Sequence, residues 1–399
     1  MAYGFTLDDV RYLRSAAGVD ALSEAAKLTL SDATLLTDVS TAKKFAGDRT
    51  GAVIETVRLR RRAVGKLGER AGGWLFTDEA LQQASPWPVA VHRAGRMATT
   101  GTGVHDLTCS IGTDLAALTQ ARCQPVLGSD LDPVRLTMAA VNVSDVSLVR
   151  ADALARTSGG LLPYADPARR SAGRRITTVD TVPSVAELDD AHRRRPAVLR
   201  LPPGIDYDAL ARPGETEIVS LDGTVREAVL WPEQLADGGI RRRASVLASD
   251  GTLWGVTDLD DDGGAATAAA AVDRWIVDPD AAVVRAHLVR QFGARHRLHL
   301  LDPHLAYLSG DEPPPGTRAF RVLDCARYRE RTVAGWLRRD RVGTLEIKQR
   351  GTPVIPDELR RRLRPAMSTD TRTAATLVIA RIGDGPMAYW CRPNDGRAR

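Results

Sequence analysis

The fold of this chain is decided by the stretch His105-Asp106-Leu107-Thr108-Cys109-Ser110-Ile111-Gly112-Thr113-Asp114. It joins an apolar segment to the helical pattern of residues 114–121, so it predicts a tight turn between a strand and a helix. Small residues in such a turn let the backbone approach a ligand closely, and the N-terminus of the following helix presents unpaired N–H donors. A ligand site is one interpretation of this turn, and an ordinary strand-to-helix connection is the other.

Short apolar segments alternate with helical patterns from about residue 102 to residue 231. Strands separated by helices are typical of a parallel sheet covered on both faces, so we expect an α/β fold with a doubly wound, Rossmann-like sheet of seven strands. The expected strands are residues 104–109, 125–130, 146–152, 161–166, 197–202, 216–222 and 227–231, with helices at 114–121 and 133–143.

Acidic side chains end the first three expected strands, at Asp106, Asp130 and Asp152. A carboxylate at the tip of the second strand is placed to accept hydrogen bonds from both hydroxyls of a ribose, and one at the third tip could bind an adenine amino group. Carboxylates at the ends of three successive strands favour one shared adenosyl ligand over a chance arrangement. A nicotinamide enzyme would normally keep its phosphate-binding glycines, whereas Thr108 and Ser110 stand at those positions.

The fourth expected strand ends in Asp166-Pro167-Ala168-Arg169-Arg170. A carboxylate at this tip could accept a proton or a hydrogen bond from a nucleophilic amine, so we expect Asp166 to lie at the reaction site. Arg169 and Arg170 could hold a phosphate. The alternative is a turn of aspartate and proline followed by solvated arginines.

Composition indicates an ordinary globular protein, because 43% of the 399 residues are hydrophobic and 26% are charged. No run approaches the ~20 apolar residues of a membrane span, and the N-terminus lacks a secretory pattern, so we expect a cytoplasmic protein. The four cysteines form no CxxC pair and no HExxH pattern is present, so no metal site is expected.

Positive charge is concentrated at the C-terminal end, where residues 317–399 contain 19 Arg and Lys against 9 Asp and Glu. These basic side chains either contact nucleic-acid phosphates or form a solvated helix face. The candidates for phosphate contact are Lys348, Arg350, Arg360, Arg361, Arg362 and Arg364.

The two flanks of the expected sheet have their own patterns. Helical periodicity runs from Thr6 to about residue 66, and the arginines of residues 53–67, with Lys66, either contact an anion or form a solvated face. After the sheet a helix is expected over residues 280–294, followed by alternating strands and helices in the last 80 residues. The expected domains are 1–78 (helical), 79–235 (Rossmann-like), 236–316 (connecting α+β) and 317–399 (basic α+β).

Taken together, the motifs HDLTCSIGTD, GSDLDP, RADA and ADPARR resemble those of bacterial class I methyltransferases that end in a THUMP-like domain. The stretch GWLFTDEALQQAS before them and GTLEIKQRGTPVIPDELRRRL near the C-terminus extend the resemblance over nearly the whole chain. Thr108 and Ser110 replace glycines of the family's first motif, and no aromatic residue follows Asp166-Pro167.

This resemblance implies S-adenosylmethionine as cofactor and an RNA, either tRNA or rRNA, as substrate. The carboxylate of Asp166, placed to accept a proton from an amine, adds the expectation that a nitrogen is methylated. Asp166 and Pro167 would then lie at the reacting centre. The alternatives are a non-catalytic RNA-binding protein and a methyltransferase acting on a small molecule. Gln83 and Ser85 match family positions that cover the ligand. The residues implied for cofactor binding are Gln83, Asp106, Thr108, Ser110, Gly112, Asp114, Asp130 and Asp152.

Overall fold

The computed structural model describes residues 3–169 and 181–394, and the chain divides into two compact units. The first unit comprises Met1–Leu221, Arg226–Gly239 and Leu247–Thr252. The second comprises Asp222–Val225, Ile240–Val246 and Leu253–Arg399. No helix within the described ranges is long and apolar enough to cross a membrane.

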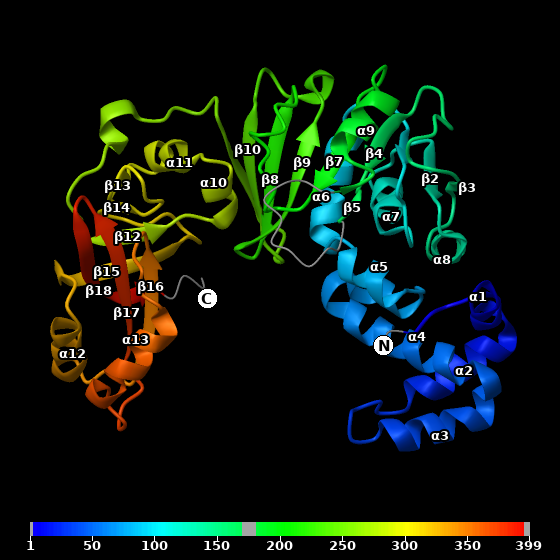
Figure 1. Cartoon of the computed structure of the whole chain (residues 1–399), viewed down its shortest axis with the longest axis horizontal. Coiled ribbons are helices and arrows are strands. Elements are labelled where there is room, and N and C mark those ends of the chain that lie inside the picture. The colour runs from blue at the N-terminus through cyan, green and yellow to red at the C-terminus, as the bar shows by residue number, and fades with distance from the viewer. Residues whose placement is uncertain (1–2, 170–180, 395–399) are drawn as a thin grey trace. The chain divides into compact units, whose positions relative to one another are not determined.

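The first unit begins with four helices (Figure 1). Each of them buries one face in a shared apolar core. The first helix starts where the sequence predicts, since the Thr6 hydroxyl accepts a hydrogen bond from the Asp9 N–H at 3.2 Å and Asp9 accepts the Thr6 N–H at 2.9 Å. The core of these helices includes Ile111 from the predicted turn and Met138 from a later helix, so the helices also support the sheet region. They are α1 (Leu7–Arg14), α2 (Ala16–Ala26), α3 (Leu35–Ala46) and α4 (Thr50–Leu67).

The larger sheet has nine strands in the order β11-β10-β8-β9-β7-β4-β1-β2-β3. Strands β3, β2, β1, β4 and β7 run parallel, and β9 is antiparallel to β7. All seven strands predicted from the sequence are present, so the expected α/β fold is confirmed. The strands are β1 (Val104–Asp106), β2 (Val126–Asp130), β3 (Ser147–Arg150), β4 (Leu162–Ala165), β7 (Val198–Leu201), β8 (Glu215–Leu221), β9 (Thr224–Trp231), β10 (Arg242–Leu247) and β11 (Leu253–Thr257).

The order of these strands determines where a ligand can bind. The chain runs outward from β1 through β2 to β3 and then returns to place β4 on the other side of β1. Such a reversal opens a crevice beyond the carboxyl ends of the central strands, which is where open α/β sheets bind ligands. The remaining regular elements of this region are α5 (Asp78–Gln83), α6 (Trp87–Ala98), α7 (Thr113–Gln120), α8 (Pro133–Asn142), α9 (Val185–Ala191), β5 (Ala168–Arg169) and β6 (Thr181–Val182).

The second unit contains a seven-stranded sheet in the order β13-β14-β12-β15-β18-β17-β16. The helices α12 (Glu330–Arg339) and α13 (Pro356–Leu363) pack on one face of it (Figure 1). On that face the Trp336 and Trp390 rings stack with centroids 5.8 Å apart. The alternating strands and helices predicted for this region are confirmed. The strands are β12 (Trp275–Asp278), β13 (His299–Leu300), β14 (Leu308–Gly310), β15 (Arg318–Arg327), β16 (Thr344–Arg350), β17 (Ala374–Ile382) and β18 (Gly385–Asn394).

One expected helix of the second unit is wrong. Instead of a single helix over residues 280–294, the chain forms α10 (Ala281–Arg285) and α11 (Val289–Arg295). His287 between them has a φ of 61°, a left-handed conformation that a helix cannot continue through. The buried side chains of Val283 and Leu288 lie on either side of this break, so tertiary packing outweighs the local helical pattern.

Candidate active site

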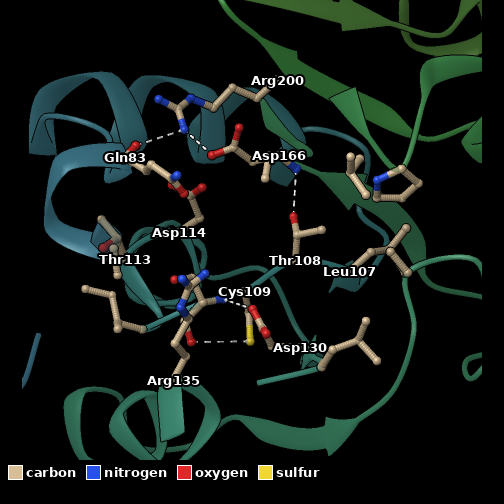
Figure 2. A pocket seen from close by; sticks show the side chains of 18 of the residues that line it. Gln83, Leu107, Thr108, Cys109, Thr113, Asp114, Asp130, Arg135, Asp166 and Arg200 are labelled. Carbon is tan, nitrogen blue, oxygen red and sulfur yellow. Dashed lines mark hydrogen bonds and ion pairs between the residues drawn. The ribbon is translucent and has the colours of Figure 1, made fainter. Parts of the chain in front are cut away.

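A pocket of about 340 Å³ opens in the first unit where β1, β2 and β4 end (Figure 2). Small-molecule sites usually have volumes of about 300–1,000 Å³. Asp166, predicted for the reaction, lines the pocket. So do six of the residues predicted for cofactor binding, namely Gln83, Thr108, Ser110, Asp114, Asp130 and Asp152.

The remaining predicted residues, Asp106, Gly112 and Pro167, are buried behind the wall of the pocket and do not line it. Asp106 is 1% exposed, and its Oδ1 accepts the Thr108 N–H at 3.1 Å. Burial raises the pKa of Asp106 well above its ordinary value, and the neighbouring charge of Asp114 adds to the rise. Asp106 therefore shapes the turn from behind.

The predicted turn is held in an unusual backbone conformation. Gly112 has a φ of 88°, and a Cβ atom there would lie 2.9 Å from the Val143 side chain, so only glycine fits. Ser110 also has a positive φ, 49°. Its N–H donates to Asp130 Oδ2 at 3.0 Å, while Asp130 Oδ1 accepts the Asp132 N–H at 2.8 Å. The carboxylate of Asp130 thus ties the tip of β2 to the turn.

Asp114, in the first turn of α7, is a second anchored carboxylate. Its Oδ1 accepts from Arg93 Nη2 at 2.6 Å, and its Oδ2 accepts from the Tyr164 hydroxyl at 2.8 Å. Burial would raise the pKa of Asp114, but the charges of Arg93 and Arg200 and the Tyr164 hydrogen bond lower it overall. Asp114 is therefore ionised at neutral pH.

Asp166 is joined to the rest of the site by Arg200 (Figure 2). Arg200 Nη1 donates to Asp166 Oδ2 and, at 3.2 Å, to the Gln83 carbonyl oxygen, while its Nε donates to Glu227 Oε2 at 3.0 Å. Glu227 also accepts from Arg93 Nη1. Burial raises the pKa of Asp166 above its ordinary value, although Arg200 opposes the rise. Alternating charges therefore run unbroken from Asp114 to Asp166.

Two further side chains show how the pocket wall could meet a ligand. Thr113 lines the pocket, and its buried hydroxyl has no hydrogen-bond partner within the part of the chain that the structure describes. A buried hydroxyl without a partner is costly, so a ligand that supplied one would be favoured. Asp152 follows β3 by two residues and is exposed, and its Oδ1 accepts the Leu154 N–H at 2.9 Å.

Sequence reasoning missed the basic half of this network, Arg93 and Arg200, and its buried partner Glu227. Arg200 lies between leucines in β7, and Arg93 is 1% exposed on α6. A charge inside an otherwise apolar strand or on the apolar face of a helix must be paired when it is buried. That pattern was available in the sequence, but the identity of the partners depends on the fold.

The predicted phosphate contacts of the second unit do not form one surface. Leu345 and Ile347 of β16 are buried under α13, so Lys348 and Arg350, which alternate with them, lie on the opposite face of the sheet from α13. Three of these predicted cations already pair with a carboxylate. The pairs are Lys348 with Glu346 at 3.7 Å, Arg350 with Asp278 at 2.7 Å and Arg360 with Asp357 at 2.5 Å.

Three other predicted cations of this unit are exposed. Arg361 and Arg364 form no ion pair with the described part of the chain, whereas Arg362 pairs with Glu330 at 2.9 Å. In the first unit, the backbone of Arg169 belongs to β5, and Arg170 lies outside the described residues.

Comparison with known proteins agrees with this geometry. Uncharacterized S-adenosylmethionine-dependent methyltransferases from two strains of Mycobacterium tuberculosis are each 48% identical to the chain over 365 residues, which covers 87% of this chain and 98% of theirs. The crystal structure of a proposed methyltransferase from Porphyromonas gingivalis has the same fold. Its TM-score is 0.70, with 18% identity, and the match covers 99% of this chain and 100% of that one.

Two family models match parts of the chain. Residues 317–393 match the model described as THUMP domain-like, and residues 6–63 match a domain of unknown function. The identity to the mycobacterial relatives extends over most of both chains, and the pocket lies where this fold binds its ligand. The chain therefore belongs to the S-adenosylmethionine-dependent methyltransferases that carry a THUMP-like domain at the C-terminus.

Proposed function

We propose that this methyltransferase modifies a nitrogen atom of a nucleotide in RNA, either tRNA or rRNA. The observation that carries the proposal is the arrangement of Asp166, which lines the pocket. Its Oδ2 is held by Arg200, while its Oδ1 has no hydrogen-bond partner within the described residues. The THUMP-like match at residues 317–393 supports an RNA acceptor.

The residues of the pocket fit the cofactor. When bound, S-adenosylmethionine supplies a methyl group on a positively charged sulfur. We assign the ribose hydroxyls to Asp130, because each carboxylate oxygen that accepts a backbone N–H keeps a second lone pair. Asp152 would bind the adenine amino group. Thr108, Ser110 and Gln83 would cover the remaining part, with the free hydroxyl of Thr113 beside them.

Charge also suits a cationic ligand. Five carboxyl groups line the pocket against two guanidinium groups, those of Arg135 and Arg200. Arg135 is already paired with Glu79 at 2.6 Å. The pocket therefore has a negative surplus that stabilises a positive ligand. The five carboxyl groups belong to Asp114, Asp130, Asp152, Asp166 and Glu187.

Asp166 would act on the acceptor. An N–H nitrogen that takes the methyl group from the sulfonium and ends up neutral must lose its proton, and Asp166 Oδ1 would accept that proton or its hydrogen bond. Arg200 would hold the carboxylate in one orientation. Pro167, which is buried, restricts the backbone of Asp166 to extended conformations and so helps to fix the carboxylate in place.

We assign phosphate contacts in the second unit first to Arg361 and Arg364, because both are exposed and neither has an ion-pair partner within the described residues. Lys348, Arg350, Arg360 and Arg169 remain secondary candidates. The division at residues 1–78, 79–235, 236–316 and 317–399 is also part of the proposal, and the family models at 6–63 and 317–393 fall inside its first and last segments.

The experiment that tests this function compares modified nucleosides from cells with and without the gene, by mass spectrometry of total tRNA and rRNA. We expect one N-methylated nucleoside to be lost in the deletion strain and restored by the wild-type gene but not by a gene encoding Asp166→Ala. Unchanged nucleosides in both RNA classes would contradict an RNA acceptor and favour a small molecule.

A further inference from the structure

A group of cations lies beside the pocket, around the C-terminal end of α5 in the first unit. Lys66, near the end of α4, donates to the carbonyl oxygens of Leu81 at 2.8 Å and Gln82 at 2.9 Å. Arg200 donates to the next carbonyl, that of Gln83. The last carbonyls of α5 are therefore held by two cations, directly before the segment that lines the pocket.

Arg226 joins this group from the sheet. Strand β9 is antiparallel to β7, and Ala228 lies opposite Leu201, the last residue of β7. Arg226 therefore lies beyond the carboxyl end of β7, at the edge of the sheet that carries the pocket. It is exposed and forms no ion pair with the described residues. Burial lowers the pKa of Lys66, and the charges of Arg200, Arg226 and Arg62 lower it further.

Helix α4 extends the positive charge away from the pocket. Arg58, Arg62 and Lys66 are spaced by four residues, so they form one stripe about 12 Å long on the helix surface. The side chains of Arg58 and Arg62 are 45% and 53% exposed, and they pair with Glu55 at 3.7 Å and Asp78 at 2.5 Å. Both remain accessible to a ligand.

The other two arginines of α4 have a structural role. Arg60 donates to the Trp74 carbonyl oxygen at 2.9 Å, and Arg61 donates to the Thr29 carbonyl oxygen at 2.7 Å. Their guanidinium groups satisfy backbone carbonyls at other points of the helical region. The sequence presented these arginines as one run, and the structure separates the run into a packing pair and an exposed stripe.

We propose that Arg58, Arg62, Lys66 and Arg226 form a rim that binds the RNA backbone next to the acceptor nucleotide. The inference rests on the proposed function, because it takes RNA as the substrate. A polyanion approaching a pocket lined by a surplus of carboxyl groups is repelled, and cations at the mouth offset that repulsion. The four side chains are cationic and none is aromatic, so the rim suits contacts to phosphates rather than stacking on bases.

The test measures binding of the full-length protein to a fluorescent single-stranded RNA of mixed sequence, about 20 nucleotides long, by anisotropy over a range of salt concentrations. Arg226→Glu is the main variant and Arg58→Glu the second. Arg122→Glu is the matched control, because Arg122 is exposed and precedes β2, at the opposite edge of the sheet from the pocket. Calorimetry with S-adenosylmethionine checks that each variant keeps its cofactor affinity.

We expect Arg226→Glu and Arg58→Glu each to bind RNA about 5- to 10-fold more weakly at low salt, with a shallower salt dependence, while Arg122→Glu matches the wild type. If the wild type binds RNA and the rim variants bind it as tightly as Arg122→Glu, the rim is refuted and the RNA substrate stands. If the wild type binds no RNA, both are refuted. If polyglutamate binds the wild type as tightly as RNA does, the proposed partner of the rim becomes an acidic protein in place of RNA.

Discussion

The carboxylate of Asp130 holds two pieces of backbone at once, the left-handed Ser110 and the start of the loop into α8. A residue with this geometry cannot be replaced without moving the turn. We therefore expect Asp130→Ala to weaken S-adenosylmethionine binding by about 10- to 100-fold, because hydrogen bonds to a charged group contribute about 1.5–3 kcal/mol. Isothermal titration calorimetry measures the change, with Asp152→Ala as a comparison. Equal affinities in wild type and Asp130→Ala would remove the ribose assignment.

Asp166 should behave in the opposite way. Asp166→Ala is expected to bind S-adenosylmethionine within about threefold of the wild type and to lose about 100-fold or more in kcat, the usual contribution of general base catalysis. Transfer of a labelled methyl group to RNA from the deletion strain provides the rate. Asp166→Asn keeps the hydrogen bond to Arg200 but cannot accept a proton, so activity retained by that variant would show that the carboxylate only orients the site.

His105 of β1 gives the protein a pH dependence of stability. It is 2% exposed between Ser158 and Ser129, and burial lowers its pKa to about 4, with a further contribution from His192. An unfolded chain binds the proton near pH 6.5 and the native chain does not, so stability is lost as the pH falls from about 6.5 to 4, by up to about 3 kcal/mol.

Denaturant unfolding of wild type and His105→Asn at pH 7.5 and pH 5 isolates this effect, because the other titrating groups are common to both proteins. The wild type is expected to lose more stability between the two pH values than His105→Asn. Equal losses would mean that His105 titrates in the same range in the native and unfolded chains.

Individual elements show which parts of the fold can be predicted from sequence. The strands β1, β2 and β4 and the helices α7 and α8 follow from apolar periodicity and small turn residues, which are local properties. The break at His287 and the left-handed Ser110 depend on contacts made after the chain has folded. The carboxylates at the strand tips could be predicted because their positions follow from the local strand pattern. The pairing of these carboxylates with Arg93 and Arg200 could not be predicted, because it depends on the folded chain.

Helix α6 is fixed to the sheet by buried charges, so removing its buried arginine should destabilise the folded protein. Arg93 is 1% exposed and pairs with Asp114 and Glu227. Arg93→Met removes the buried cation between two carboxylates, which keep only Tyr164 and Arg200 as partners, so we expect a loss of about 3–5 kcal/mol in the free energy of unfolding. Arg11→Met is the control, because its pair with Asp8 is solvent-exposed on both sides and should contribute less than about 1 kcal/mol.

The comparison is made by chemical denaturation of both variants at pH 7.5. An unfolding midpoint of Arg93→Met equal to that of Arg11→Met would contradict the view that the network between α6 and the sheet stabilises the protein.

Across the whole chain, the four cysteine thiols should differ in reactivity according to whether they are buried or exposed. The four cysteines are free, and Cys109, Cys123 and Cys391 are buried whereas Cys325 is exposed. Burial raises the pKa of each buried thiol, which keeps it in the unreactive protonated form. We expect a thiol reagent at pH 8 to modify one cysteine rapidly in the native protein and all four after denaturation, with Cys325→Ser abolishing the fast reaction.

The separation of Arg93 from its partner Glu227 has a consequence for synthesis on the ribosome. The two residues lie 134 positions apart, so until β9 has been translated Arg93 can pair with Asp114 but lacks its second buried carboxylate partner. Independent folding of the earlier half is opposed until then, although domains otherwise tend to fold as they appear. Removing residues after about position 221 would therefore yield a polypeptide that aggregates, and the methyl-transferring half cannot be cut free at that point.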